Sequence, residues 1–154
     1  MRISPDVGSR LARFAPTAID ADLAALSDRE RAILARLVRT SARLDELFLR
    51  QASEDNPALR EALAQDPSPL AREALAYFDL SAGPWDRLDE EPFVGDEPRP
   101  RGAGFYPKDL TKEELEAWIA AHPGDAEAMR SLYTVIRRQG GALVAIPYSI
   151  AYRQ

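Results

Sequence analysis

The strongest periodic pattern of apolar and polar residues lies in residues 27–54. Ser27 and Glu30 have the spacing of a capping box, which satisfies free backbone N–H groups at the start of a helix. Apolar residues then recur at intervals of three, four and seven, with charged residues between them. They are Ile33, Leu34, Leu37, Val38, Leu44, Leu47 and Phe48. The pattern predicts an amphipathic helix of about six turns, ending between Gln51 and Glu54.

The flanking segments carry weaker patterns. The first twenty residues contain two prolines and no clear period, which predicts an extended lead-in. After the long helix, Asn56-Pro57 and Ser68-Pro69 each join a cap residue to a proline, the pair that favours a helix start. We therefore expect two shorter helices, the second of which ends at Gly83-Pro84.

Proline, glycine and aromatic residues dominate residues 83–107. Prolines and glycines at nine positions make regular structure improbable. The same segment carries four aromatic side chains, Trp85, Phe93, Phe105 and Tyr106, which a solvated linker seldom has. We expect an ordered loop that its aromatic residues pin onto the body of the protein.

A helix and a β-hairpin are predicted for the remainder. Thr111 and Glu114 form a second capping box, and the helix that they open ends at residues 122–124. After a short helical turn, residues 133–148 read as two strands around Gly140-Gly141, a pair suited to the positive φ angles of a tight turn. A two-stranded hairpin is marginal alone, so it either lies across the helices or joins a sheet encoded beyond Gln154.

These elements predict a mainly α fold with a C-terminal β-hairpin, an α+β arrangement. Four or five helices are expected to pack around the long one. We interpret residues 1–154 as a single helical lobe.

Composition narrows the function. The chain has 154 residues, 45% hydrophobic and 29% charged, with a formal net charge of −5. A net negative charge does not attract phosphate backbones or anionic lipid, so we expect no nucleic-acid or membrane partner. The N-terminus lacks the apolar core of a signal peptide, and no run of 18 apolar residues occurs, which indicates a cytoplasmic protein.

Few residues offer catalytic or metal-binding chemistry. The chain has one histidine, His122, and no cysteine, so it cannot by itself build a typical zinc, haem or iron–sulfur site. The acidic residues 89–91 either bind a divalent cation or, as we favour, anchor the loop or face solvent. His122 is either a general base or, as we favour, a partner of the carbonyl groups at a helix end.

Three further features have a functional and a structural interpretation. Residues 99–104 cradle a phosphate or form an ordinary turn, and the turn is favoured because the P-loop pattern is absent. Trp85 and Trp118 line a pocket or belong to the core. Arg137 and Arg138 put one guanidinium on each face of a strand, where one recognises a carboxylate or both form surface ion pairs.

Five stretches spread over nearly the whole chain form a set. They are residues 13–16, 44–51, 83–88, 104–114, and 133–138 with 144–148. Together they resemble the N-terminal region of bacterial proteins in the dipeptidyl-peptidase III family of zinc metallopeptidases. The resemblance implies an exopeptidase that removes dipeptides from the N-termini of short peptides. It also implies a zinc ion held by two histidines and a glutamate.

A single histidine cannot supply two zinc ligands, so no catalytic or metal-binding residue carries over to this chain. We therefore expect an N-terminal lobe that is inactive alone, with zinc in a missing C-terminal part of the parent enzyme. Its partners would be that C-terminal catalytic domain and the peptide substrate. Tyr106, Arg137 and Arg138 are the predicted substrate contacts, beside a hairpin that feeds a sheet for an extended peptide.

Two alternatives belong to other classes of function. One is a complete helical module that binds a protein or peptide and does no chemistry. A small hydrolase with a cation bound at residues 89–91 ranks below both.

Overall fold

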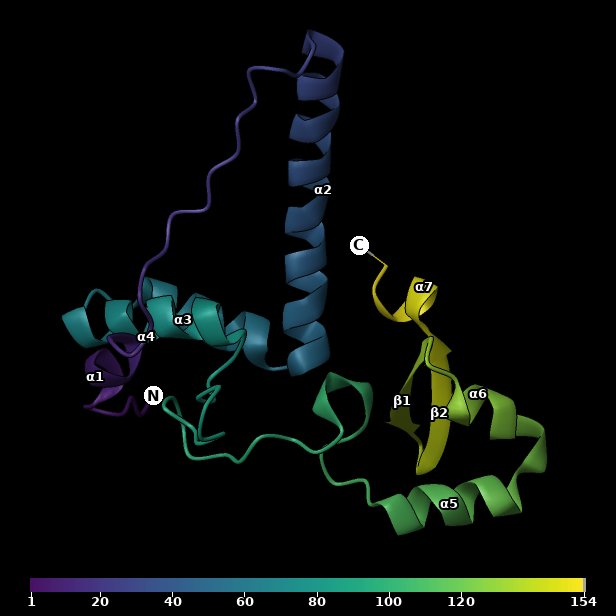
Figure 1. Cartoon of the computed structure of the whole chain (residues 1–154). Helices are drawn as coiled ribbons and strands as arrows, with labels where there is room; N and C mark the ends of the chain where they lie inside the picture. The colour runs from purple at the N-terminus through teal and green to yellow at the C-terminus, as the bar shows by residue number, and fades with distance from the viewer. Residues whose placement is uncertain (154) are drawn as a thin grey trace.

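The computed structural model describes residues 1–153 and contains short helices, one long helix and a hairpin (Figure 1). The elements in chain order are α1 (Val7–Leu11), α2 (Asp28–Ala52), α3 (Asn56–Gln65), α4 (Pro69–Ser81), the 3₁₀ turn η1 (Ala103–Phe105), α5 (Lys112–Ala121), the 3₁₀ turn η2 (Pro123–Asp125), α6 (Ala126–Arg130), β1 (Thr134–Gln139), β2 (Ala142–Pro147) and α7 (Tyr148–Ala151). The predicted mainly α fold with a C-terminal β-hairpin is confirmed.

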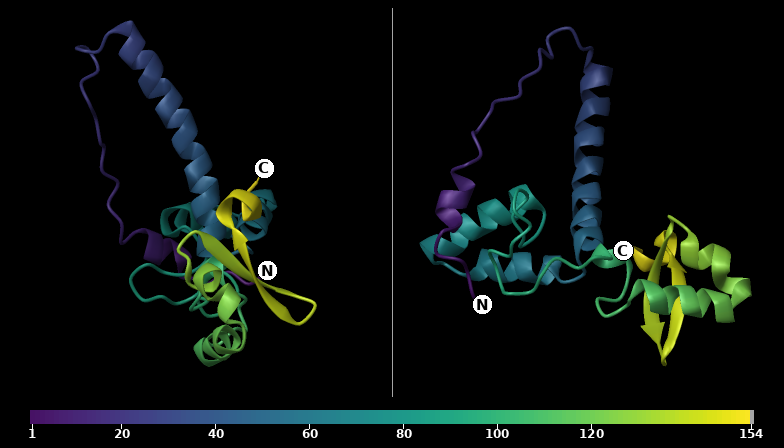
Figure 2. Two further views of the ribbon diagram at one scale, coloured as in Figure 1. Left: turned by 90° about the vertical axis from the view of Figure 1, so that its right-hand side faces the viewer. Right: turned by 60° about the horizontal axis from the view of Figure 1, so that its bottom comes forward.

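Helix α2 starts and ends where the sequence predicts. The Ser27 hydroxyl accepts from the Glu30 N–H, and the Glu30 carboxylate accepts from the Ser27 N–H at 2.8 Å, so the capping box is complete. None of the α2 residues is buried, and its N-terminal part projects away from the other elements (Figures 1 and 2). Helix α3 and the turn η1 pack near its C-terminal end, and α5 and α6 lie farther away, beyond the hairpin (Figures 1 and 2). Within residues 1–153, no helix combines the length and apolarity needed to cross a bilayer.

A first hydrophobic core joins α1, α3 and α4 to the loop that follows α4. Its buried side chains are Val7, Leu63, Ala74, Tyr77, Phe78, Phe93 and Val94. The prediction of an extended segment over the first twenty residues is wrong for α1, whose Val7 is fully buried. The backbone N–H of Ser4 donates to the Phe93 carbonyl at 2.9 Å, which fastens the start of the chain to this loop.

The starts of α3 and α4 differ from each other. Ser68 caps α4 as predicted, because its hydroxyl accepts from the Ala71 N–H at 3.2 Å. Asn56 is not the cap of α3 but its first residue, and its side chain is buried. The Asn56 amide donates to the carbonyls of Leu49 at 3.1 Å and Ala82 at 3.2 Å. This asparagine therefore ties the end of α2 to the end of α4.

A second core lies between the hairpin and the helices α5 and α6. Its buried side chains are Ile119, Met129, Ile136 and Leu143. The strands pair in antiparallel register from Thr134 opposite Pro147 to Gln139 opposite Ala142. Gly140 and Gly141 both have positive φ, as the predicted tight turn requires. The hairpin thus packs against α5 and α6 through one buried core.

The turn η1 joins the two cores. Gly104 is buried against the last turn of α2, where a Cβ atom would overlap the carbonyl oxygen of Arg50. On its other side, the Gly104 carbonyl accepts from the Arg137 guanidinium of β1 at 3.0 Å. Glycine is needed at this position because two backbones meet there without room for a side chain.

The contact of η1 with the last turn of α2 and with Arg137 is here termed the joint. Replacing Gly104 with alanine tests it. We expect Gly104→Ala to lower the free energy of unfolding by about 2 kcal/mol, because the methyl group meets backbone that cannot move aside. Urea denaturation followed by circular dichroism measures the change.

Gly124→Ala is the matched control, since no atom lies within 4 Å of the added methyl group. We expect it to change stability by less than about 0.5 kcal/mol. Equal effects of the two substitutions would show that the close approach at Gly104 does not hold the cores together.

Candidate functional site

Arg137 on β1 is tied to the backbone of η1. Its Nη2 donates to the Gly104 carbonyl at 3.0 Å, and its Nη1 donates to the Ile136 carbonyl at 2.7 Å. The guanidinium also forms an ion pair with Glu54, just beyond the end of α2. These partners come from both sides of the joint, so the Arg137 side chain holds the hairpin against α2 and η1.

Arg138 points to the opposite face of the strand and binds two carboxylates. Its Nη1 and Nη2 donate to the two oxygens of Glu114 at 2.7 and 2.8 Å, and its Nε donates to Asp109 at 3.0 Å. These hydrogen bonds lower the pKa of both acids and raise the pKa of Arg138. The surface ion pair favoured from the sequence is present for Arg138.

The ion pair of Arg138 with Glu114 explains why the predicted capping box at the start of α5 is incomplete. Thr111 accepts from the Glu114 N–H at 3.1 Å, so the predicted cap exists. The returning half of the capping box is absent, because the Glu114 carboxylate is bound by Arg138. The sequence specifies the cap residues but not the arginine that competes for the glutamate.

Tyr106, the third predicted contact, is half-buried and packs against the second core. It adjoins an aromatic cluster at the base of the hairpin, made of Phe105, Tyr133, Tyr148 and Tyr152. No sequence motif connects these tyrosines. A hairpin that turns at Gly140-Gly141 places Tyr133 opposite Tyr148, so the sequence register could have paired these two tyrosines. In the structure, the Tyr148 N–H donates to the Tyr133 carbonyl at 2.9 Å. Burial raises the pKa of Tyr148 and of Tyr152.

The three predicted contacts do not converge on one group. Arg137 points toward η1 and α2, whereas Arg138 points toward the start of α5. A ligand that used both arginines would have to reach both faces of β1. The arrangement therefore suits one arginine as a structural tie and the other as a surface cation.

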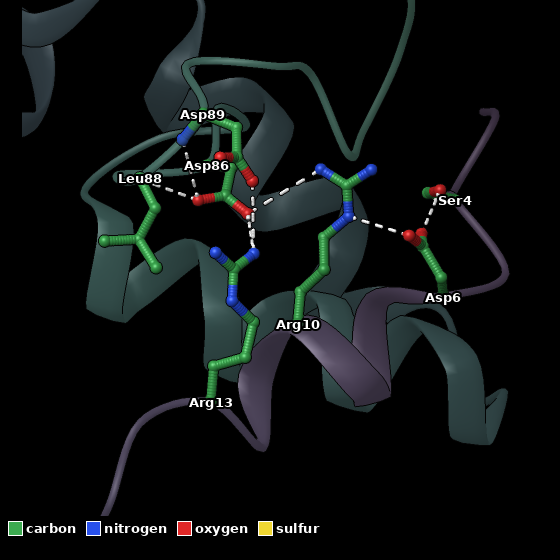
Figure 3. Close-up of polar contacts among 7 residues, drawn as sticks. All are labelled: Ser4, Asp6, Arg10, Arg13, Asp86, Leu88 and Asp89. Atoms are coloured by element: carbon green, nitrogen blue, oxygen red, sulfur yellow. Dashed lines mark hydrogen bonds and ion pairs between the residues drawn. The ribbon is translucent and has the colours of Figure 1, made fainter.

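Asp86 is the most buried charged group of the first core, and no sequence motif distinguishes it from a surface acid. Its side chain is 1% exposed and accepts from the Leu88 N–H at 2.7 Å. Arg10 and Arg13 reach it from α1 and the following turn, at 3.7 and 3.4 Å (Figure 3). Arg13 also contacts Asp89 at 3.1 Å.

Opposing effects set the protonation of Asp86. Burial acts to raise its pKa, but the Leu88 N–H and the Arg13 charge help to outweigh burial and hold the pKa below its ordinary value. Burial and the nearby Asp86 raise the pKa of Tyr77 to about 12. An ionised carboxylate enclosed in this way is an anchor for α1 and has no open face for a substrate.

The residues considered for metal binding have other partners. Asp89 pairs with Arg13, and Glu90 pairs with Arg99 at 3.6 Å, so both anchor the loop. Within residues 1–153, no three acidic or histidine side chains lie together as a metal ion would require. The residues present therefore do not fit a zinc site.

His122 takes the structural role that the sequence favours. Its Nδ1 lies 2.9 Å from the Trp118 carbonyl at the end of α5. The imidazole also stacks on the Trp118 ring, with 4.0 Å between ring centroids. This histidine closes the helix end.

A groove of about 940 Å³ lies between α3 and the loop of residues 84–101. Trp85 lines it, as one of the sequence alternatives allows, and the indole N–H donates to the Glu97 carbonyl at 2.8 Å. Arg99, Arg101 and Lys108 also line the groove. Asp55 and Glu97 line it as well, and Lys108 pairs with Asp55, so the groove carries charges of both signs.

Comparison with known proteins identifies close structural relatives. The chain superposes on dipeptidyl-peptidase III from Caldithrix abyssi with a TM-score of 0.91 and 46% identity, over 94% of this chain and 28% of that one. For dipeptidyl-peptidase III from Corallococcus sp. strain EGB, the TM-score is 0.88 and the identity 38%, over 97% of this chain and 29% of that one. The predicted resemblance to the bacterial dipeptidyl-peptidase III family is confirmed.

The remaining comparisons are more distant. A match to Nudix hydrolase 3 of Arabidopsis thaliana is 26% identical over 197 residues, covering 94% of this chain and 26% of that protein. No family model matches the chain. The chain therefore spans between a quarter and a third of the length of the relatives it matches.

Replacing Asp86 with asparagine tests the anchor of α1. We expect Asp86→Asn to lower the free energy of unfolding by about 2 kcal/mol at pH 7, because the contacts of the buried carboxylate with Arg10 and Arg13 lose their negative charge. The folded-state pKa of Asp86 lies below its ordinary value of 3.8, so the contribution of its charge is complete above that pH. The contribution is lost as the pH falls through the folded-state pKa, and the two proteins should converge there.

Urea denaturation at pH 7, 5, 3.5 and 2.5 measures this difference. Asp89→Asn is the control, since the exposed Asp89 binds the same Arg13 and should contribute little. A gap between wild type and Asp86→Asn that stays constant down to pH 2.5 would contradict an ionised anchor.

Proposed function

We propose that this chain forms a non-catalytic lobe of a dipeptidyl-peptidase III-like zinc exopeptidase, an enzyme that removes dipeptides from peptide N-termini. The observation that carries the proposal is the 46% identity and TM-score of 0.91 to the Caldithrix abyssi protein over 94% of this chain. In this proposal, residues that this chain does not contain supply the zinc ligands. The complete enzyme acts in the cytoplasm on short peptides.

The chemistry of the chain supports a non-catalytic role. One histidine cannot provide the two that the resemblance implies for zinc. The most buried carboxylate, Asp86, is enclosed by its own partners rather than directed at an open surface. The lobe would contribute shape and contacts, and the joint at Gly104 would keep its two cores in fixed relation.

In the same proposal, the peptide lies along the hairpin edge and contacts Tyr106, Arg137 and Arg138 at separate points, since the two arginines lie on opposite faces of β1. Arg138 is the better suited of the two arginines to bind a peptide carboxylate, because its present partners Asp109 and Glu114 are themselves exposed and can return to water. Arg137 supports the site by holding η1. Tyr106 packs against the hairpin core and follows Phe105, whose carbonyl accepts from Arg137.

A chimera tests the proposal. This chain would replace the matching region of the Caldithrix abyssi enzyme, and release of dipeptides from a synthetic peptide would be measured. We expect the chimera to bind one zinc ion and to release dipeptides, whereas the 154-residue chain alone releases none. A folded chimera that binds zinc but has no activity would contradict the proposed function.

Substitution of Arg138 in the chimera tests the peptide contact. We expect Arg138→Gln to raise KM roughly tenfold with kcat unchanged, because one charged hydrogen bond to the peptide is lost.

Arg130→Gln is the matched control, since Arg130 of α6 forms a similar exposed ion pair with Glu116 of α5. A KM that is equal for both variants would remove Arg138 from the substrate contacts.

A second candidate function is a helical module that binds a protein or peptide without catalysis. The exposed apolar residues of α2 favour it, since they offer a surface for a partner. An inactive chimera, together with a stable and monodisperse isolated chain, would favour this module over the enzyme lobe.

A further inference from the structure

Helix α2 carries an exposed row of apolar side chains, here termed the α2 stripe. Its members are Ile33, Leu34, Leu37, Val38, Leu44 and Phe48. The side chains of Leu37, Val38 and Leu44 are 61%, 62% and 60% exposed. Their spacing places them on one side of the helix. The stripe is thus a continuous apolar surface rather than scattered single residues.

Little of the described part of the chain packs against the α2 stripe. A helix of 25 residues is about 37 Å long, yet α2 packs on α3 and η1 near its C-terminal end. Residues 15–25 are exposed and form an extended segment that runs apart from α2, between α1 and the N-terminal end of α2 (Figures 1 and 2). Amphipathic helices gain most of their stability from packing the apolar face. We therefore expect another surface to cover this one.

The lower end of the α2 stripe opens into a hollow. The hollow has a volume of about 770 Å³ and lies between α2 and the ends of α3 and α4. Phe48, Leu49 and Leu80 form its apolar lining. Arg60 and Asp79 make a two-point ion pair at its edge, with distances of 2.7 and 2.9 Å. A covering surface can lie along the helix and insert an apolar side chain at its base.

The charge of α2 indicates the chemistry of the cover. Residues 31–44 contain four arginines and no acidic residue, although the whole chain has a net charge of −5. Arg36 and Arg39 make no ion pair with any residue among 1–153. A surface with an apolar centre and a rim of aspartate and glutamate would complement this helix.

We propose that the α2 stripe is the docking surface for the part of a dipeptidyl-peptidase III-like polypeptide that this chain does not span. That part presents an apolar patch rimmed by carboxylates. The inference rests on the proposed function, and the 28% coverage of the Caldithrix abyssi chain leaves ample polypeptide to form the cover.

Two other occupants fit less well. A second copy of this chain would bring two arginine-rich segments face to face, which costs electrostatic energy. An anionic membrane would attract α2 but repel the rest of a chain with a net charge of −5.

Hydrogen exchange and one substitution test the docking surface in the chimera. We expect the amides of residues 33–44 to exchange at least roughly tenfold more slowly in the chimera than in the isolated chain, because a covered helix opens less often. We expect Leu37→Asp to lower the melting temperature of the chimera by roughly 5 °C and to abolish this protection.

Ala35→Asp is the matched control. It adds the same charge to the same helix on the opposite face, and its cost in helix propensity is at least as large. We expect it to keep the protection of the unsubstituted chimera and to lower the melting temperature by less than Leu37→Asp does. Equal losses in both variants would assign the effect to the helix itself and overturn the docking surface.

The outcomes separate the two proposals. An active chimera whose stability and protection Leu37→Asp leaves unchanged overturns the docking surface but keeps the proposed function. An inactive chimera in which residues 33–44 are protected supports docking and contradicts the proposed function.

Two further results would assign the α2 stripe to another occupant. One is a dimer of the isolated chain that Leu37→Asp dissociates, with no protection in the chimera. The other is binding of the isolated chain to phosphatidylserine-containing vesicles, again with no protection in the chimera. Either result overturns the proposal.

Discussion

The meeting of two backbones at Gly104 is the contact on which the rest of the arrangement depends. The turn η1 reaches the last turn of α2 only because position 104 has no side chain. The same turn offers its carbonyls to Arg137, so one short segment is held from both sides. The other links between the hairpin core and the N-terminal core are the connecting loop and ion pairs such as that of Lys108 with Asp55. The placement of the hairpin beside the base of α2 thus follows from one glycine and one arginine.

The N-terminal core holds the five-residue helix α1 in place. Such a helix is too short to be stable alone. Val7 supplies an apolar anchor, while Asp86 accepts contacts from Arg10 and Arg13. The carboxylate is desolvated, but backbone N–H groups and two guanidiniums compensate for the loss of water. Apolar packing fixes the position of α1, and the charged contacts fix its orientation.

Much of the fold could be predicted from local sequence, because helix caps and tight turns are encoded by a few adjacent residues. Ser27, Ser68 and Thr111 cap helices as expected, and Gly140-Gly141 forms the hairpin turn. Helix α1 was missed because five residues are too few to display a period. Asn56 was misassigned because its buried partners are distant in sequence or belong to other helices. In each failure, tertiary contacts decide what local preference leaves open.

The candidate site was less predictable than the fold for the same reason. Arg137 and Arg138 were recognised as important cations, but their sequence does not reveal that one binds backbone carbonyls and the other two acids. Asp86 carries no motif that distinguishes a buried anchor from a surface acid.

The contact between Arg13 and Asp86 joins residues that are 73 positions apart in the chain. During synthesis, α1 therefore leaves the ribosome long before its carboxylate partner exists. The hairpin core, by contrast, draws on residues close together in sequence and closes small loops. Residues 7–13 thus cannot complete their contacts until residue 86 has been made, and α1 waits for its carboxylate partner through the synthesis of α2, α3 and α4.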